Sequence, residues 1–156
     1  MGYTTEFYGK VEIVPPLNEL EIEFLNNFSS TRRMLRENGP YYVDGSGYAG
    51  QGPDADVFDY NSPPKCQPGL WCQWVPTDDG KFIKWDGNEK FYDSVEWMEY
   101  LIEHFLKPNC IAQKDLPFLQ ANHVVNGKIR AQGEDRGDSW CLIVEDNVVS
   151  AVDIDD

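Results

Sequence analysis

The segment from Asp86 to Lys107, DGNEKFYDSVEWMEYLIEHFLK, constrains the fold more than any other part of the chain. Asp86 and Glu89 are expected to form a capping box at its start. Its periodicity predicts a helix with two faces that both need cover. The first face is a broad apolar arc, typical of a helix packed on a sheet. It consists of Phe91, Val95, Met98, Leu101, Ile102 and Phe105. The second consists of Asp93, Trp97, Tyr100 and His104. Since one sheet covers only the first face, we expect a long loop or a partner to cover the second.

The chain before this segment begins with a predicted strand and a predicted helix. Residues 4–14 alternate between apolar and polar side chains and are rich in β-formers. Asn18 and Glu21 then form the capping box of a helix, which we expect to end at Asn38-Gly39-Pro40. The core-facing side chains expected of this helix are Leu20, Phe24, Phe28, Thr31 and Leu35.

The remaining strands are predicted from short β-rich runs and turn signals. Residues 70–75 and 81–85 flank Asp79-Gly80, which favours a hairpin. Residues 123–132 contain Asn126-Gly127, the strongest hairpin dipeptide, and are expected to form a second hairpin. Runs at 140–145 and 148–154 complete a C-terminal meander.

These elements predict an α+β fold with the order β-α-β-β-α-β-β and a further C-terminal strand. The economical arrangement is a single antiparallel sheet, or a mixed one, with both helices packed on one face. The first six elements have the order of a split βαβ, or ferredoxin-like, core. A chain of 156 residues is most simply one domain, residues 1–156.

Charge and composition exclude several classes of protein. The chain has 27 acidic and 13 basic residues, a net charge of −14, and should repel nucleic-acid backbone and anionic membrane over most of its surface. Its aromatic content of 13% is too high for a disordered acidic chain. No run approaches the length of a membrane span, and the N-terminus lacks a signal-peptide pattern. We therefore expect a cytoplasmic protein without generic nucleic-acid binding.

The cysteines and histidines give little support to a metal or catalytic site. The spacing of Cys66, Cys72, Cys110 and Cys141 matches no zinc or redox signature. Reduced thiols are expected, although a cysteine nucleophile paired with His104 or His123 is an alternative. Acidic groups at Asp54, Asp56 and Asp59 and at Glu134, Asp135 and Asp138 lack the calcium-loop pattern. We predict no metal and no cofactor.

The strongest candidates for ligand binding are arginines and aromatic residues around the loop 39–69. This loop is rich in glycine, proline and tyrosine, and it is far longer than an ordinary connection. Its Gly45 to Gly50 stretch matches G-x-G-x-x-G but lacks the helix that a dinucleotide site requires. Three arginines precede it and form either an anion site or a favourable helix terminus. The candidate ligand-binding residues are Arg32, Arg33, Arg36, Tyr42, Tyr48, Trp71, Trp74, Asp93, Trp97, Tyr100 and His104.

Four segments of the chain resemble a known family. They are RRMLRENGPYYVDG, GLWCQWVPTDDG, WDGNEKFYDSVEWMEYLIEHFL and NGKIRAQGED. Together they resemble a family of uncharacterised proteins carried by bacteriophages and scattered bacteria, over roughly residues 2–149. The resemblance implies no activity, cofactor or catalytic residue. It implies a setting, namely a small accessory protein that acts against or inside a host cell.

Two classes of function follow from these observations, with binding favoured over catalysis. In the first, the second face of the helix and the loop form a pocket for a nucleotide-like small ligand, which the protein sequesters from a host defence pathway. In the second, the acidic surface inhibits a host protein or mimics nucleic acid. An alternative to this pocket is that the loop simply fills the second face of the helix and leaves no room for a ligand. A hydrolase of unknown substrate is the outside alternative.

Overall fold

The computed structural model describes residues 3–37, 39–43, 57–59 and 61–154. The elements in chain order are β1 (Glu6–Val14), α1 (Glu19–Ser30), β2 (Leu35–Arg36), β3 (Val57–Asp59), β4 (Trp74–Pro76), β5 (Phe82–Trp85), α2 (Ser94–Leu101), the π-helical turn η1 (Ile102–Leu106), the 3-10 turn η2 (Ile111–Lys114), β6 (Val124–Gln132), β7 (Ser139–Glu145) and β8 (Val148–Asp153).

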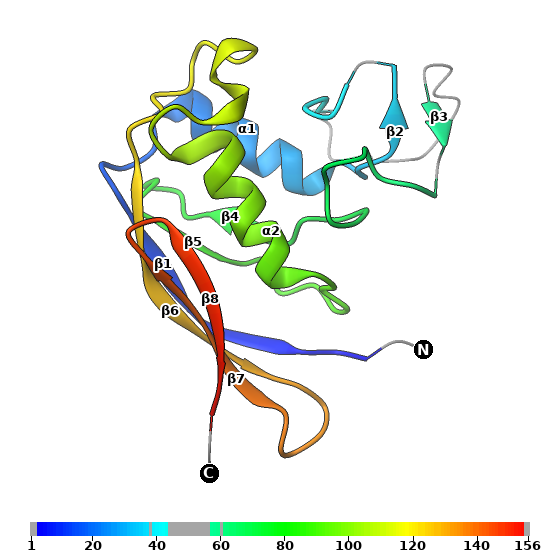
Figure 1. Ribbon diagram of the computed structural model, residues 1–156, viewed down its shortest axis with the longest axis vertical. Coiled ribbons are helices and arrows are strands. Elements are labelled where there is room, and N and C mark those ends of the chain that lie inside the picture. Colours follow the sequence, from blue (N-terminus) through cyan, green and yellow to red (C-terminus); the bar gives the residue numbers. More distant parts are fainter. Residues whose placement is uncertain (1–2, 38, 44–56, 60, 155–156) are drawn as a thin grey trace.

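The main sheet has six strands in the order β4-β5-β1-β6-β7-β8, and every neighbouring pair is antiparallel. Strands β6-β1-β5-β4, with α1 between β1 and β4 and α2 between β5 and β6, have the arrangement of a ferredoxin-like core. The hairpin β7–β8 extends this core at one edge (Figure 1). The predicted α+β class is therefore confirmed. A small sheet, β2–β3, lies apart from the main one.

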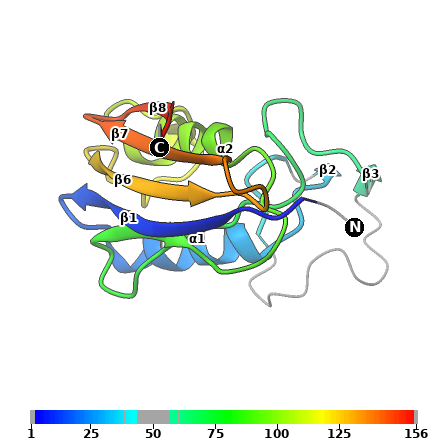
Figure 2. The ribbon, with the colours of Figure 1, turned by 90° about the horizontal axis from the view of Figure 1, so that it is seen from below.

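Both helices cover the same face of the main sheet (Figure 2). Alternation along the strands sends one set of side chains into the core and the other to solvent. Val11, Val125, Ile129 and Leu142 are fully buried on the helix side. No helix of the described residues lies on the opposite face, and polar side chains such as Lys10 on it are exposed.

Helix α1 begins as predicted but ends earlier. The Asn18 side chain accepts a hydrogen bond from the Glu21 N–H at 2.8 Å, and the Glu21 carboxylate accepts one from the Asn18 N–H at 2.9 Å. The helix stops at Ser30 rather than near Asn38, so the predicted end is wrong. The chain is extended from Thr31, and the Arg33 N–H donates to the Leu70 carbonyl at 2.7 Å. A tertiary hydrogen bond thus replaces the helical one.

The early end of α1 changes the predicted core. Phe24, Phe28 and Thr31 are buried as expected. Leu20 and Leu35, however, are 58% and 39% exposed. Leu35 leaves the helical face because it lies in β2, and Leu20 points to solvent from the first turn of α1.

Helix α2 is shorter than its sequence pattern. It begins at Ser94, and the predicted capping box at Asp86 is wrong, because the Asp86 carboxylate instead accepts a hydrogen bond from the Asn88 N–H in a turn. Lys90 and Asp93 have left-handed backbone conformations, with φ of 61° and 59°, which no helix tolerates. The helix continues into η1, where the Lys107 N–H donates to the Ile102 carbonyl. The predicted core arc is buried apart from Val95, which is half-buried.

The second face of α2 is covered partly by α1 and partly by the loop. Phe28 of α1 contacts Trp97 and Tyr100, with ring centroids 5.9 and 6.1 Å apart. From the described part of the loop, Tyr41 bonds to His104 at 2.7 Å, and the Gln67 amide donates to the Tyr100 hydroxyl at 2.9 Å. Cover of this face by α1 was not predicted, because no sequence pattern connects Phe28 with Trp97 and Tyr100.

Strand β6 runs through Asn126-Gly127, so the predicted hairpin there is wrong. Gly127 has a φ of 151°, and a Cβ atom at this position would lie 2.8 Å from the Val11 Cα of β1. Glycine is therefore required for the close approach of two central strands. The tight turn lies at Asp146-Asn147, which joins β7 to β8 with φ values of 45° and 72°.

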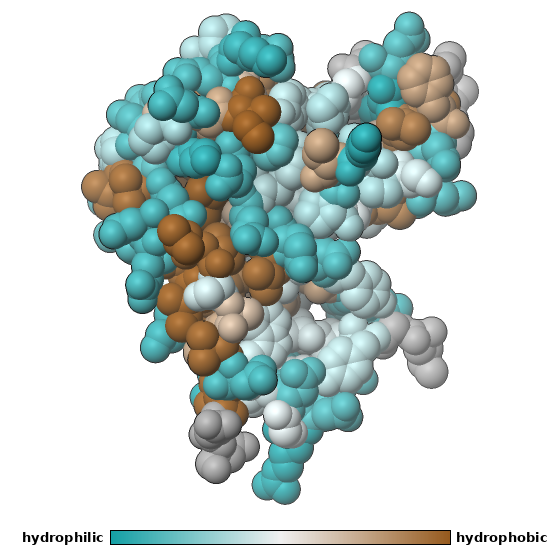
Figure 3. Space-filling model, in the orientation of Figure 1, coloured by the Kyte–Doolittle hydropathy of each residue, from teal (hydrophilic) through white to brown (hydrophobic). Residues whose placement is uncertain are grey.

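Strand β8 forms one edge of the main sheet and exposes apolar side chains. Val148 and Val152 are 69% and 51% exposed. Hydrophobic surface gathers along this edge in the space-filling view (Figure 3).

Candidate functional site

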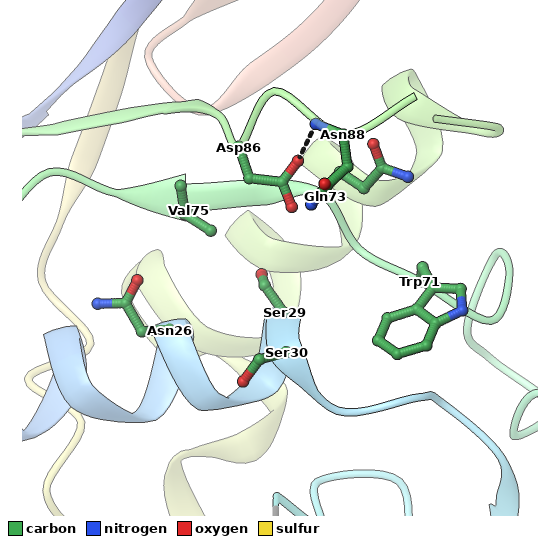
Figure 4. Close-up of a pocket in the computed structure, with 8 residues that line it drawn as sticks. All are labelled: Asn26, Ser29, Ser30, Trp71, Gln73, Val75, Asp86 and Asn88. Carbon is green, nitrogen blue, oxygen red and sulfur yellow. Dashed lines mark hydrogen bonds between the residues drawn. The ribbon is translucent and has the colours of Figure 1, made fainter. Parts of the chain in front are cut away.

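A hollow of about 560 Å³ lies between the end of α1, strand β4 and the turn after β5. In Figure 4 the α1 residues lie along one side, Asp86 and Asn88 along the other, and the Trp71 ring at one end. We call this hollow the Trp71 cleft. Its lining residues are Asn26, Ser29, Ser30, Trp71, Gln73, Val75, Asp86 and Asn88.

Hydrogen bonds hold the walls of the Trp71 cleft in place. Ser29 Oγ donates to the Trp74 carbonyl at 2.7 Å and ties α1 to β4. The Gln73 side chain accepts from Trp85 Nε1 at 3.2 Å and donates to the Glu89 carbonyl at 3.2 Å. The side chains are therefore positioned by the fold before any ligand arrives, which lowers the entropic cost of binding.

Asp86 is the ionisable group of the Trp71 cleft. Its backbone N–H donates to the Gln73 carbonyl at 2.9 Å, which continues the pairing of β4 with β5. Burial raises the pKa of the Asp86 carboxyl, although the hydrogen bonds from Asn88 oppose this effect. A carboxylate in this position is a strong acceptor for N–H and O–H groups.

A second hollow of about 450 Å³ shares Trp71 and Gln73 with the cleft. We call it the flanking hollow. Its other lining residues are Gly69, Leu70, Glu89, Lys90, Tyr92 and Asp93. Trp71 and Tyr92 are 37% and 55% exposed, so both hollows offer aromatic surface to a ligand. Burial, followed by the nearby charge of Glu96, raises the pKa of the Asp93 carboxyl.

One buried polar group lies next to the flanking hollow. Trp97 is fully buried, and its Nε1–H has no hydrogen-bond partner among the residues that the structure describes. A Cβ atom at Gly69 would lie 3.7 Å from Trp97 Nε1 and 3.5 Å from Asp93 Oδ2. Because residue 69 is a glycine, the wall of the flanking hollow lies close to the Trp97 Nε1–H.

The predicted arginines do not line either hollow. Arg33 is buried, lies 4.2 Å from the Phe28 ring, and donates hydrogen bonds to the carbonyls of Thr31 and Pro40 at 3.1 and 3.2 Å and to that of Tyr42. Burial lowers its pKa to about 10. The Arg33 guanidinium therefore binds backbone carbonyl groups rather than an anion.

The other two arginines lie near the same segment. The guanidinium of Arg36 is buried over the Tyr42 ring, 4.4 Å from its centroid. Arg32 is half-buried, with Nη2 3.5 Å from Asn61 Oδ1. Tyr42 is therefore an arginine partner, and Tyr48 lies outside the described residues.

The predicted aromatic residues of α2 form a packed cluster. Tyr100 and His104 stack with ring centroids 3.8 Å apart, and burial lowers the pKa of His104. Burial also raises the pKa of the Tyr41 hydroxyl to about 12, so we assign the Tyr41 O–H as donor to a neutral His104 ring. Trp74 is buried and donates from Nε1 to the Ser94 carbonyl at 2.8 Å. Of the predicted residues, Trp71 and Asp93 line the hollows at Trp71.

Tyr100 and His104 line a third hollow, of about 510 Å³, on the exposed side of α2. Three glutamates of α2 and η1, Glu96, Glu99 and Glu103, share its wall. This hollow is acidic, whereas the Trp71 cleft is lined mainly by neutral amides and hydroxyls.

Sequence reasoning missed seven of the residues that line the cleft, namely Asn26, Ser29, Ser30, Gln73, Val75, Asp86 and Asn88. The first five carry no spacing signal, because they come from a helix face and from the segment around β4, which meet only in the fold. Asp86-Gly87-Asn88 does carry one, since this composition is typical of a turn. It was interpreted as a helix cap.

Within the described ranges, no three His, Cys, Asp or Glu side chains are grouped as a metal site would need. Nor does any helix there combine the length and apolar character of a membrane span. Comparison of the chain with protein-family models, with curated proteins and with solved structures finds no match.

Proposed function

We propose that this protein binds a small, ring-bearing ligand in the Trp71 cleft. The observation that carries the proposal is the exposed indole of Trp71 at one end of a preformed hollow whose other walls are amide, hydroxyl and carboxylate groups. An aromatic plane beside a few convergent polar groups is the usual composition of a small-molecule site.

The chemistry of the lining favours a nucleoside-like ligand. The ring would stack on Trp71, and the side-chain amides of Asn26, Gln73 and Asn88 both donate and accept hydrogen bonds, as the edge of a base requires. Asp86 would accept from a ring N–H or a ribose hydroxyl. Among the described residues, the cation Lys90 lines the flanking hollow, and no cationic side chain lines the cleft. We therefore expect phosphate groups to contribute little to the affinity.

A setting for such binding comes from the family resemblance. In a phage accessory protein, capture of a nucleotide-like signal would remove it from a host defence pathway. The function would then be sequestration without chemical change of the ligand.

Saturation-transfer NMR with a panel of nucleosides, nucleotides and monosaccharides tests this proposal. A nucleoside should give a signal in the wild type, the matching nucleotide should bind no more tightly, and Trp71→Ala should abolish both signals. Phe58→Ala removes an exposed aromatic residue from β3 and serves as the matched control. Equal signals from the wild type and Trp71→Ala would refute the assignment of the site.

The acidic face of α2 supports a second candidate, an inhibitor that binds a basic surface of a host protein. Glu96, Glu99 and Glu103 are all exposed along this helix and its continuation. Binding of this kind should weaken steeply with salt, whereas binding in the Trp71 cleft should not. Titration of any ligand or partner at two salt concentrations therefore separates the two candidates.

A further inference from the structure

The open face of the main sheet carries a strip of cations. Lys10 on β1 lies opposite Lys84 of β5 on one side and Lys128 of β6 on the other, so three lysines form one row across three strands. In the adjacent row on the same face, Tyr8 lies opposite Arg130. All five side chains are exposed.

This arrangement is costly for the fold. Like charges directly opposite each other on neighbouring strands destabilise a sheet. Within the described part of the chain, ion pairs join Lys107 to Glu103 and His123 to Glu21, and no cation of the strip takes part in one. The chain has 27 acidic residues, so carboxylate partners are not scarce. The strip thus stands unneutralised in a molecule of net charge −14.

Tyr8, the aromatic residue next to the lysine row, favours one class of anionic partner over another. Tyr8 is 53% exposed, and its hydroxyl donates to Glu6 at 2.5 Å, which fixes the ring on the surface. Phe82 is less accessible, because the Lys10 ammonium lies 4.1 Å from its ring centroid. An acidic peptide requires only the cations. An unpaired nucleotide uses both the cations, through its phosphate, and the ring, through stacking of its base.

We propose that this face of the sheet binds a short stretch of single-stranded nucleic acid. Lys84, Lys10, Lys128 and Arg130 would contact phosphates, and a base would stack on Tyr8. Glu6 and Glu12 border the strip on β1 and confine the contact to a few nucleotides. The negative charge elsewhere excludes a long duplex, in agreement with the expectation that the protein is no generic nucleic-acid binder. The proposal does not depend on the Trp71 cleft.

Fluorescence anisotropy with a labelled oligo-dT of about 12 nucleotides tests the proposal. With three or four phosphate contacts, affinity should fall about 20- to 50-fold between about 50 and 200 mM NaCl. The double variant Lys10→Gln/Lys128→Gln should bind at least about tenfold more weakly, with a salt slope smaller by about 1.4. Tyr8→Ala should lower the affinity by about fivefold or more.

The controls keep the total charge and the number of exposed rings equal. Lys65→Gln/Lys114→Gln removes two exposed lysines elsewhere, and Phe58→Ala removes an exposed ring elsewhere, so both should bind like the wild type. Circular dichroism of each variant checks the fold.

The proposal is overturned if the wild type does not bind at about 50 mM salt, if the control lysine pair matters as much as the strip, or if Trp71→Ala abolishes binding. If polyglutamate competes equally per charge and Tyr8→Ala has no effect, the partner is an acidic protein segment instead.

Discussion

Arg33 shows how one buried side chain shapes the segment between α1 and the Trp71 cleft. Its guanidinium bonds to carbonyl groups on both sides of a bend, at residue 31 and at residues 40 and 42. The planar fork of donors suits this task, and the ammonium of lysine does not. The sequence could suggest an arginine cluster but not whether its donors point toward a ligand or toward backbone.

We expect Arg33→Met to lower the free energy of unfolding by about 2–4 kcal/mol, because the buried carbonyls would lose their donors. Arg33→Lys should not restore the loss. Arg32→Met, at a half-buried position, is the control and should cost less than about 1 kcal/mol. Urea denaturation measures all three, and similar midpoints for the two methionine variants would contradict this role.

His123 and Glu21 form a buried pair that joins α1 to the start of β6. His123 Nε2 lies 3.0 Å from Glu21 Oε2, and Nδ1 donates to the Pro15 carbonyl at 2.7 Å. Burial alone would lower the pKa of His123, but the hydrogen bonds and charge of Glu21, together with Pro15, raise it. The imidazolium is thus stabilised in the folded state.

The pH dependence follows from this raised pKa. The contribution of His123 is fully present below the unfolded-state pKa of about 6.5 and is lost as pH rises through the higher folded-state value. Urea denaturation between about pH 6 and pH 9 should therefore show a decline in the wild type that is absent in His123→Gln. Parallel pH profiles of the two proteins would show that the histidine is neutral throughout.

At the scale of elements, α2 and η1 place the largest set of buried side chains over the sheet. Met98, Ile102 and Phe105 are fully buried, and the Ile102 carbonyl accepts the π-type bond from Lys107. This helix was predicted from its sequence because its periodicity follows from local geometry.

We expect Ile102→Ala to cost about 2–5 kcal/mol, through lost burial and an unfilled cavity. Val95→Ala, at a half-buried position on the same face, should cost clearly less. Differential scanning calorimetry of both variants checks the order. Equal losses would mean that the apolar arc is not the face on which the core depends.

Local sequence signals predicted individual helices and strands well. They predicted contacts between distant segments of the chain poorly. The capping box at Asn18 and the strands β1 and β5 depend on neighbours in sequence, and they were found. The end of α1 depends on Leu70, and the course of β6 through Gly127 depends on its contact with Val11. The Trp71 cleft combines residues 26–30, 71–75 and 86–88, which no spacing rule connects.

At the scale of the whole molecule, charge is unevenly distributed. The helix side carries exposed glutamates such as Glu96 and Glu99, and the open sheet face carries the lysine row. A net charge of −14 on a compact body still produces self-repulsion, which salt screens.

We therefore expect the melting temperature to rise by several degrees between about 10 mM and about 0.5 M NaCl, because the Debye length falls from about 30 Å to less than 8 Å. Sodium chloride is preferable to sulfate, which stabilises proteins by exclusion from their surface. A melting temperature that stays constant or falls over this range would show that favourable ion pairs outweigh the repulsion.

The position of β1 in the sheet has a consequence for biosynthesis. It leaves the ribosome before either strand that it pairs with, because its neighbours β5 and β6 begin only at Phe82 and Val124. Such long-range pairing slows folding, since a long loop must close before the strands gain their hydrogen bonds. The nascent chain must therefore carry an unpaired, partly apolar β1 until β5 and β6 have been translated, and it completes its core only after the segment containing β6 has emerged.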